Sequence, residues 1–286
     1  DQAGFPKGVL NVITGGPEVG ATLTSHAKVA HVAFTGGPET ARHIVRNSAE
    51  NLASTSLELG GKYPFIVFDD ADLESAVNAQ VSGVFAATGQ SCVSGSRLVV
   101  HAAIKDAFLA RLKEKAEAIV VGAPSEMATE IGPLCTLRQR DNALDLIEKS
   151  INQGAKLITG GQALDRDGFY FSPTILDCDN CAEAASLSQE FFGPVLSVVS
   201  FQTEAEAVEI ANDTQFGLAS GLFTQNLTRA HRMIRAIRAG IVWVNTWMMR
   251  DLRTPFGGVK ASGVGREGGF EALRFFTEAK NVCIKY

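Results

Sequence analysis

The stretch Val32-Ala33-Phe34-Thr35-Gly36-Gly37-Pro38-Glu39-Thr40 decides the fold of this chain. Its apolar first half is typical of a buried strand, and Pro38 stands at the first position expected for a helix. Between the two, Gly36 and Gly37 form a turn. Open backbone N–H groups at a helix start bind anions, so a pyrophosphate group is expected to fit here, unless the glycines form only an ordinary strand-to-helix turn.

Strands and helices alternate on both sides of this turn. Residues 9–13 are predicted as a strand and 18–25 as a helix, with Gly15 and Gly20 in a second glycine-rich turn that enters the helix. Neither turn is a G-x-G-x-x-G fingerprint. Further strands are predicted at 29–34, 63–68, 97–100, 156–159, 195–200, 220–224 and 241–245. Further helices are predicted at 39–47, 72–85, 105–119, 138–153, 204–213 and 229–238. This alternation predicts an α/β fold with a parallel sheet.

The segment 255–269 differs from the rest. It holds six glycines in fifteen residues, too many for a regular element, so we expect a loop that approaches another backbone closely. A helix near 270–276 and an apolar strand at 281–286 are predicted after it. Because an unpaired strand edge is a liability, the terminal strand is expected to pair with another domain or subunit.

Composition excludes several classes of function. The chain has 286 residues and a formal net charge of −5, so it offers no basic surface for nucleic acid or anionic lipid. No apolar run approaches the roughly 18–20 residues of a membrane span, and no signal peptide is visible. The five cysteines, including Cys178 and Cys181 at C-x-x-C spacing, indicate neither a disulfide framework nor a zinc site. We expect no metal and a cytoplasmic location.

Two residues carry groups suited to covalent chemistry. Cys92 follows Gly89-Gln90-Ser91 near the end of a predicted helix, where a thiol can face a cleft; the alternative is a buried, inert thiol. Glu58 lies in Leu57-Glu58-Leu59-Gly60-Gly61-Lys62, where two glycines leave room for a ligand. A carboxylate in an apolar wall has a raised pKa, which suits a general base; the alternative is an exposed position on a half-buried strand. Together the two groups could form and hydrolyse a thioester.

The ordered motifs resemble the aldehyde dehydrogenase superfamily over essentially the whole chain. The matching stretches are Phe34-Thr35-Gly36 and the segments 57–62, 89–92, 189–194, 244–245, 255–258 and 262–267. The resemblance implies part of a Rossmann-type cofactor domain, an α/β catalytic domain and a C-terminal oligomerisation strand. We expect the cofactor domain to occupy residues 1–58, the catalytic domain 59–254, a glycine-rich return segment 255–275, and an oligomerisation arm 276–286.

The resemblance also implies a role for each site residue. Cys92 would add to an aldehyde and form a thiohemiacetal that passes hydride to nicotinamide, and Glu58 would activate water to hydrolyse the resulting thioester. The implied function is oxidation of an aldehyde to a carboxylic acid with NAD as cofactor, NADP not being excluded. Glu190 would bind the nicotinamide ribose, with Phe192 against the ring. The expected cofactor contacts are Gly15, Gly20, Gly36, Gly37, Leu59, Gly60, Glu190 and Phe192.

Members of this family are longer upstream. That part carries a Pro-Trp-Asn motif, whose Asn helps to form the oxyanion hole, and a Lys-Pro motif that binds the adenosine ribose. Neither motif occurs in these residues, so we expect the chain to be the C-terminal part of such an enzyme, with the Cys92 backbone N–H as an oxyanion donor. The full-length protein is expected to be a homodimer or homotetramer.

The segment Met249-Arg250-Asp251-Leu252-Arg253-Thr254 precedes Phe256 at the expected substrate entrance. With the ending 280–285, it resembles the hydroxymuconic-semialdehyde dehydrogenase branch of aromatic catabolism. The guanidinium of Arg250, or else of Arg253, would then pair with the carboxylate of an anionic aldehyde. The alternative is that these arginines make structural ion pairs, one of them with Asp251.

Two other functions stay open. A CoA-acylating relative would release the thioester to CoA, although Glu58 in the base position favours hydrolysis. A non-catalytic family member could serve in assembly, although the presence of both Cys92 and Glu58 disfavours it.

Overall fold

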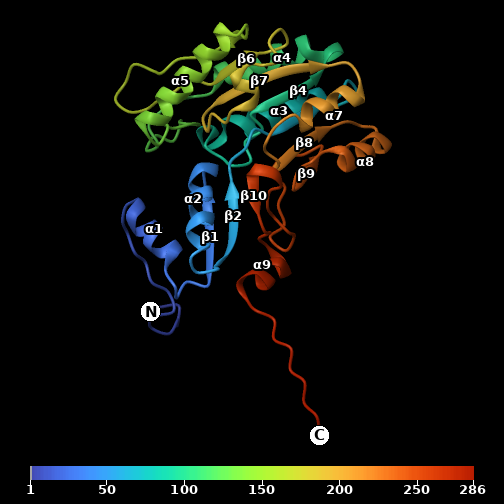
Figure 1. Cartoon of the computed structure of the whole chain (residues 1–286). Helices are drawn as coiled ribbons and strands as arrows, with labels where there is room; N and C mark the ends of the chain where they lie inside the picture. The colour runs from blue at the N-terminus through green and yellow to red at the C-terminus, as the bar shows by residue number, and fades with distance from the viewer. Residues whose placement is uncertain (1) are drawn as a thin grey trace.

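The computed structural model describes residues 2–286, which form two β-sheets with helices around them (Figure 1). The smaller sheet has the strand order β1-β2-β10, and the larger has the order β5-β6-β7-β4-β3-β8-β9. The strands are β1 His31–Gly36, β2 Ser54–Leu59, β3 Pro64–Val67, β4 Arg97–His101, β5 Lys156–Thr159, β6 Thr174–Asp177, β7 Val195–Phe201, β8 Ala219–Phe223, β9 Ile241–Val244 and β10 Gly263–Val264. The α-helices are α1 Pro17–Ser25, α2 Pro38–Ser48, α3 Leu73–Phe85, α4 Lys105–Ala118, α5 Leu137–Asn152, α6 Ala185–Ser188, α7 Glu204–Asn212, α8 Leu227–Ala236 and α9 Gly269–Phe276. Short 3-10 helices are η1 Ala86–Gly89, η2 Ala102–Ile104 and η3 Lys260–Ser262.

The predicted α/β fold class is confirmed, beginning with the stretch that suggested it. That stretch forms β1, the glycine turn and α2, with Gly37 as the helix N-cap and Pro38 as the first helical residue. After α2 the chain returns as β2, which runs parallel to β1, so the helix is the crossover between two parallel strands. The strand β2 had not been predicted, nor had β6 and β10.

The larger sheet is covered by helices on both faces. It is parallel from β6 to β9, and β5 pairs antiparallel with β6 at one edge. Side chains of β3 alternate between the faces: Phe65 packs in a cluster with Phe108 of α4, and Ile66 packs in one with Met233 of α8. A parallel sheet buried on both faces gives a firm base for the loops at its ends.

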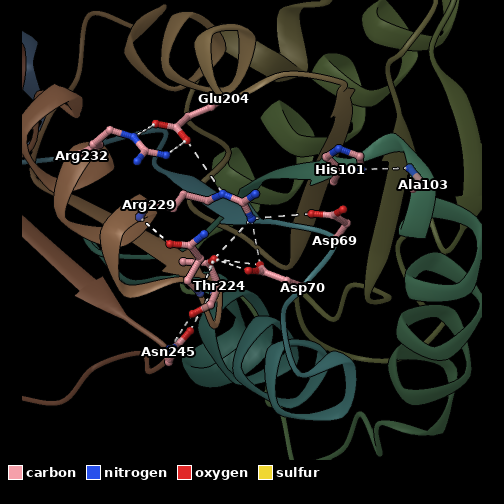
Figure 2. Close-up of polar contacts among 10 residues, drawn as sticks. Asp69, Asp70, His101, Ala103, Glu204, Thr224, Arg229, Arg232 and Asn245 are labelled. Carbon is pink, nitrogen blue, oxygen red and sulfur yellow. Dashed lines mark hydrogen bonds and ion pairs between the residues drawn. The ribbon is translucent and has the colours of Figure 1, made fainter.

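Arg229 of α8 holds the loops at the carboxyl ends of β3 and β8 (Figure 2). Its guanidinium lies 4.3 Å from the Phe68 ring centre and 3.0 Å from Asp70. The Thr224 hydroxyl donates to Asp70, and the Thr224 backbone exchanges two hydrogen bonds with the Asn245 side chain. These contacts join the loop after β3 to α8 and to the ends of β8 and β9.

Two predicted strands are not formed. Residues 9–13 and 281–286 have no helix or strand structure, and their apolar side chains, such as Val12 and Ile284, are exposed. A strand is stable only when a neighbouring strand pairs with its backbone N–H and C=O groups, and no strand within residues 2–286 does so for either segment. The predicted strand at 9–13 is therefore not found, and the one at 281–286, expected to pair with another domain or subunit, is not formed within residues 2–286. The expected role of 276–286 as an oligomerisation arm stays a prediction.

The predicted domain boundaries also stay predictions. The strand β2 spans the boundary at residue 58, and β10, from the glycine-rich return segment, pairs antiparallel with β2. The return segment 255–275 thereby comes to lie beside Glu58.

No helix in residues 2–286 combines the length and the apolar character that crossing a membrane requires.

Candidate active site

A cleft of about 480 Å³ opens where the carboxyl ends of β1 and β2 meet the loop that precedes β4. It is lined by Thr35, Gly36, Gly37, Glu58, Leu59, Gly60, Cys92, Thr136, Arg138, Gln139, Asn142, Glu190, Phe191 and Phe192. The fold therefore brings both predicted catalytic residues and most of the predicted cofactor contacts to one cleft, although they come from distant parts of the sequence.

The loop that carries Cys92 has an unusual backbone. After α3, Ala87 and Thr88 have φ values of 51° and 57°, and Gly89 has 68°. Residues other than glycine rarely adopt these left-handed values, and each costs on the order of 1 kcal/mol or more, so packing must hold the loop in place. A Cβ on Gly89 would overlap the carbonyl oxygen of Gly193. Glycine at this position lets the Cys92 loop touch the segment between α6 and β7.

Cys92 is partly buried in the cleft. Burial raises the pKa of its thiol above the ordinary value, and the charge of Glu58 raises it further. The backbone N–H of Cys92 itself lowers the pKa, which means that this donor acts on the sulfur. An oxygen on a carbon atom bonded to Sγ would lie within reach of the same N–H. The thiol is mainly protonated at neutral pH, so it needs a base before it can act as a nucleophile.

Glu58 lies at the end of β2, opposite Thr35 of β1 on one side and Gly263 of β10 on the other. Its side chain is buried at 5% exposure rather than exposed on a half-buried strand. Its Oε2 atom has no hydrogen-bond partner within residues 2–286. The backbone of Gly257 packs against the other oxygen, since a Cβ on Gly257 would lie 2.9 Å from Oε1. Neither oxygen of the carboxylate takes part in a hydrogen bond within residues 2–286, so the group is free to accept a proton.

The environment of Glu58 suits a general base. Burial raises the pKa of Glu58 to about 7, and the charge of Glu267 contributes to the increase. The positive charges of Arg266 and Arg250 act in the opposite direction. A carboxyl group with a pKa near 7 exchanges protons readily at neutral pH.

Glu190 is held at the far wall of the cleft by two glycines. The N–H of Gly61 donates to Oε1 at 2.8 Å, and a Cβ on Gly60 would overlap Oε2. Burial raises the pKa of Glu190, whereas the Gly61 N–H and the charge of Lys62 lower it. Next to it, Phe192 is partly exposed and has a φ of 49°, another left-handed residue at this site.

The start of α2 also faces the cleft. No side chain of residues 2–286 caps this helix, so the N–H groups of its first turn are open to a ligand. Space is available beside them, because a Cβ on Gly37 would meet nothing within 4 Å. By contrast, Gly15 precedes α1 and Gly20 lies inside it, and neither lines the cleft. Their position gives no support to the predicted cofactor contact.

The two arginines of the expected substrate entrance differ in their contacts. Arg253 makes an ion pair with Asp251 at 2.6 Å, the structural alternative considered from the sequence. Arg250 makes no ion pair within residues 2–286 and lies 4.2 Å from the centre of the Phe256 ring. Arg250, Phe256 and Glu267 line a second cavity of about 370 Å³. The charge of Arg250 lowers the pKa of both Cys92 and Glu58, although Arg250 lines this second cavity and not the cleft that holds them.

Some residues of the site had no predicted role. Glu267 and Arg266 lie in a quoted family motif, and the backbone of Glu267 exchanges hydrogen bonds with Phe256, which brings its charge near Glu58. Gln139, from the first turn of α5, donates to the carbonyl oxygen of Phe192. No local pattern marks Gln139, because only the tertiary fold brings α5 to the cleft.

Within residues 2–286, no cluster of three or more His, Cys, Asp or Glu side chains could hold a metal ion.

Comparison with known proteins identifies the family. The profile of the aldehyde dehydrogenase family matches residues 1–282. The chain is 62% identical to (Z)-2-((N-methylformamido)methylene)-5-hydroxybutyrolactone dehydrogenase of Acinetobacter baylyi, over 100% of this chain and 59% of that protein. It is 46% identical to betaine aldehyde dehydrogenase of Sinorhizobium fredii, over 99% of this chain and 58% of that protein. The crystal structure of PnpE, known from Pseudomonas sp. WBC-3, in complex with nicotinamide adenine dinucleotide superposes with a TM-score of 0.94 at 45% identity, over 97% of this chain and 57% of PnpE.

The chain thus spans under two thirds of the length of each of these relatives. The match nevertheless covers nearly all of its own residues, and it includes every element that lines the cleft. On this evidence the chain belongs to the aldehyde dehydrogenase family.

Proposed function

We propose that the protein containing this chain oxidises an aldehyde to a carboxylic acid, with NAD+ as hydride acceptor, Cys92 as nucleophile and Glu58 as general base. The observation that carries the proposal is the shared cleft. A thiol and a buried carboxyl with a pKa of about 7 line the same space, and the charge of Glu58 acts on the sulfur.

The cleft has features that fit NAD+. The open N–H groups at the start of α2 suit a pyrophosphate, and Gly37 leaves room for it. Glu190 offers a carboxylate to ribose hydroxyls, and the exposed Phe192 ring offers a flat apolar surface to a nicotinamide. When bound, the cofactor would supply the hydride acceptor. A complex of PnpE with the same dinucleotide supports the assignment.

Cys92 would perform the first covalent step. Its thiol passes its proton to water in the cleft, and the thiolate adds to the aldehyde carbon and forms a C–S bond, while the carbonyl π electrons move to the oxygen. The N–H of Cys92 lies beside Sγ and would donate to that oxyanion. Loss of hydride from the same carbon re-forms the C=O bond and leaves a thioester on Cys92.

Glu58 would then promote hydrolysis. Its carboxylate accepts a proton from water, and the oxygen of that water attacks the thioester carbon. The C–S bond breaks as the carboxylic acid forms, and the electron pair returns to the Cys92 sulfur. Since burial holds the Glu58 pKa at about 7, the residue can release this proton again at neutral pH.

We further propose that the substrate is an anionic aldehyde whose carboxylate pairs with Arg250. A 5-hydroxybutyrolactone, the substrate type in the name of one relative, carries its hydroxyl on the carbon bonded to the ring oxygen. Opening that ring yields an aldehyde and a carboxylate in one molecule. Arg250 has no ion pair within residues 2–286 and its charge lowers the pKa of Cys92, so we take its guanidinium to be available to the carboxylate. Betaine aldehyde, named for other relatives, is a cation that the Arg250 charge would repel.

The oligomeric state and location are part of the same proposal. Residues 277–286 carry exposed apolar side chains, including Val282 and Ile284, and no strand within residues 2–286 lies beside them. We propose that this segment pairs with a second copy in a homodimer or homotetramer in the cytoplasm. Size-exclusion chromatography with light scattering would test the assembly, and a monomeric natural gene product would contradict it.

The function itself is tested on the natural gene product that contains these residues. NADH formation would be followed with a series of oxo acids and with neutral aldehydes of the same length. We expect NADH and a free carboxylic acid, blocked by iodoacetamide. An acyl-CoA product formed with CoA present would overturn hydrolysis, and the absence of NADH with every aldehyde would overturn the proposal as a whole.

A further inference from the structure

Lys62 is a buried charged residue that has no role in the mechanism above. It follows directly after Gly60 and Gly61, the glycines that hold Glu190, and it is 0% exposed. It forms no ion pair within residues 2–286. A buried ammonium group without a carboxylate partner is costly because it has lost its hydration. Such a residue is retained at a cost in stability.

The amine of Lys62 touches three of the segments that build the cleft. It donates to the carbonyl oxygen of Ser96, just after the Cys92 loop, at 3.0 Å. It donates to the hydroxyl of Ser197, in β7, at 3.3 Å. It also lies 4.8 Å from the centre of the Phe191 ring, within range of a cation–π contact. One side chain therefore joins the nucleophile loop, the larger sheet and the segment of Glu190.

The charge of Lys62 also affects Glu190. It lowers the pKa of Glu190, against the increase that burial causes. A protonated Glu190 would have lost part of its acceptor capacity, and it would bind sugar hydroxyl groups less well. Gly61 and Lys62, which are consecutive residues, thus act on the same carboxylate, one by a hydrogen bond and the other by its charge.

We propose that Lys62, as an ammonium ion, is a positioning residue that keeps Glu190 ionised and holds Phe191 beneath it, so that the cleft presents a carboxylate to the ribose of the cofactor. The inference rests on the proposed function, because it takes NAD+ as the ligand. Lys62 acts through Glu190 and Phe191, and it contacts no reacting atom.

The ionisation of Lys62 gives the proposal a pH signature. Burial and then the charge of Arg97 lower the pKa of Lys62 to about 7, while Cys178 and Glu190 act in the opposite direction. The ammonium form is therefore present below about pH 7 and is lost as the pH rises. Because this ammonium lowers the pKa of Glu190, Glu190 should stay ionised, and affinity for NAD+ should be kept, as the pH falls below about 7. Falling pH also protonates Glu58, but the two effects separate, since one acts on KM for NAD+ and the other on kcat.

The test compares Lys62→Met and Lys62→Arg with the unmodified natural gene product. KM for NAD+, kcat and the Kd of NAD+ by fluorescence titration are measured from below to above pH 7. Lys62→Met should raise KM and Kd by about tenfold or more below about pH 7, the effect of one lost contact to a charged group, because Glu190 then becomes protonated at a higher pH. Above that pH, where Lys62 itself is neutral, the variant and the unmodified protein should converge. Lys62→Arg keeps the cation and should retain the affinity of the unmodified protein as the pH falls below about 7.

A matched control separates positioning from general stability. Lys105 is a partly buried lysine paired with Asp177 and Asp179, and it does not line the cleft. Lys105→Met should lower the unfolding midpoint and leave KM for NAD+ and its pH dependence unchanged.

An unchanged KM and an unchanged pH dependence in Lys62→Met overturn the inference. If neither Lys62 variant folds, Ser197→Ala and Phe191→Leu, which remove contacts of the Lys62 amine, are measured in their place. Both should raise KM for NAD+ by a smaller factor. An unchanged KM for NAD+ in both variants overturns the inference. If the unmodified protein binds no NAD+, the proposed function falls together with this inference. NAD+ binding that Lys62→Met leaves intact refutes the inference alone.

Discussion

Gly60 and Glu190 are in such close contact that no side chain fits at position 60, because a Cβ there would overlap Oε2 of the carboxylate. The neighbouring Gly61 N–H donates to the other oxygen, Oε1, from 129 residues away in the sequence. Two consecutive glycines at the end of β2 therefore fix both oxygens of one carboxylate. This contact defines the wall of the cleft at which the cofactor is proposed to bind.

The first prediction concerns this contact. Gly60→Ala should push the Glu190 carboxylate aside and raise KM for NAD+ by about tenfold or more, with the fold retained. Adding Glu190→Asp shortens the displaced side chain by one methylene, so the double variant should recover part of the affinity that Gly60→Ala loses. The measurement is a double-mutant cycle on the Kd of NAD+. Strictly additive losses would contradict a direct contact.

The second prediction concerns Glu58. Glu58→Gln removes the proton acceptor but keeps the shape, so the thioester should still form and then hydrolyse slowly. Rapid-mixing kinetics should show a burst of NADH followed by turnover reduced by about 10²-fold or more. Intact-protein mass spectrometry should detect the acyl group on Cys92, and Cys92→Ala should show neither burst nor adduct. Normal turnover by Glu58→Gln would rule out the base role.

The third prediction concerns the pH dependence of turnover. The Glu58 carboxylate must be ionised to accept a proton, so kcat should rise as the pH increases through about 7. Because the charge of Glu267 raises the pKa of Glu58, Glu267→Gln should move this rise to lower pH. Glu271→Gln, in the exposed ion pair with Arg274 on α9, is the control and should leave the profile in place. A profile that Glu267→Gln shifts to higher pH would contradict the assignment.

The fourth prediction separates the two arginines of the substrate entrance. Arg250→Met should raise KM for an oxo acid by about tenfold or more and leave KM for a neutral aldehyde of equal length nearly unchanged. Arg253 is already paired with Asp251 and its side chain is 89% exposed, so Arg253→Met should have little effect on either substrate. If Arg253→Met gives the selective loss instead, the pairing seen here does not hold during turnover.

The fifth prediction concerns stability. Arg229 contacts Asp70 and Phe68 and is mostly buried, so Arg229→Met should reduce the free energy of unfolding by about 1–2 kcal/mol. Arg42 forms an exposed pair with Glu39, and Arg42→Met should cost no more than about 0.5 kcal/mol. Urea denaturation followed by circular dichroism measures both. Equal losses in the two variants would mean that the Arg229 cluster has no special role.

The sequence allowed much of this arrangement to be predicted. The turn at Gly36 and Gly37, the cysteine loop and the Glu58 segment were located because each depends on short-range chemistry: glycine conformations, helix starts and reactive groups. The resemblance to a family then supplied Glu190 and Phe192, which no local pattern connects with the cleft.

The failures of prediction have a common physical cause. The apolar segments 9–13 and 281–286 have strand-like composition, yet a strand depends on a neighbour that composition does not reveal. For Glu58, the neighbours in sequence were compatible both with a buried base and with an exposed position on a half-buried strand. Its burial depends on β10 and Gly257, which arrive from about two hundred residues later, as the pairing with Gly263 shows.

The position of the cysteine loop has a consequence for how amino-acid substitutions in this protein combine. Cys92 precedes β4 and so lies beyond the amino end of that strand, whereas the Arg229 cluster follows the carboxyl ends of the parallel strands β3 and β8 (Figure 2). Substitutions at one end of the sheet share no contacts with those at the other, so their effects should add. A substitution near Cys92 that alters substrate choice can therefore be combined with an independent substitution near Arg229 that restores stability.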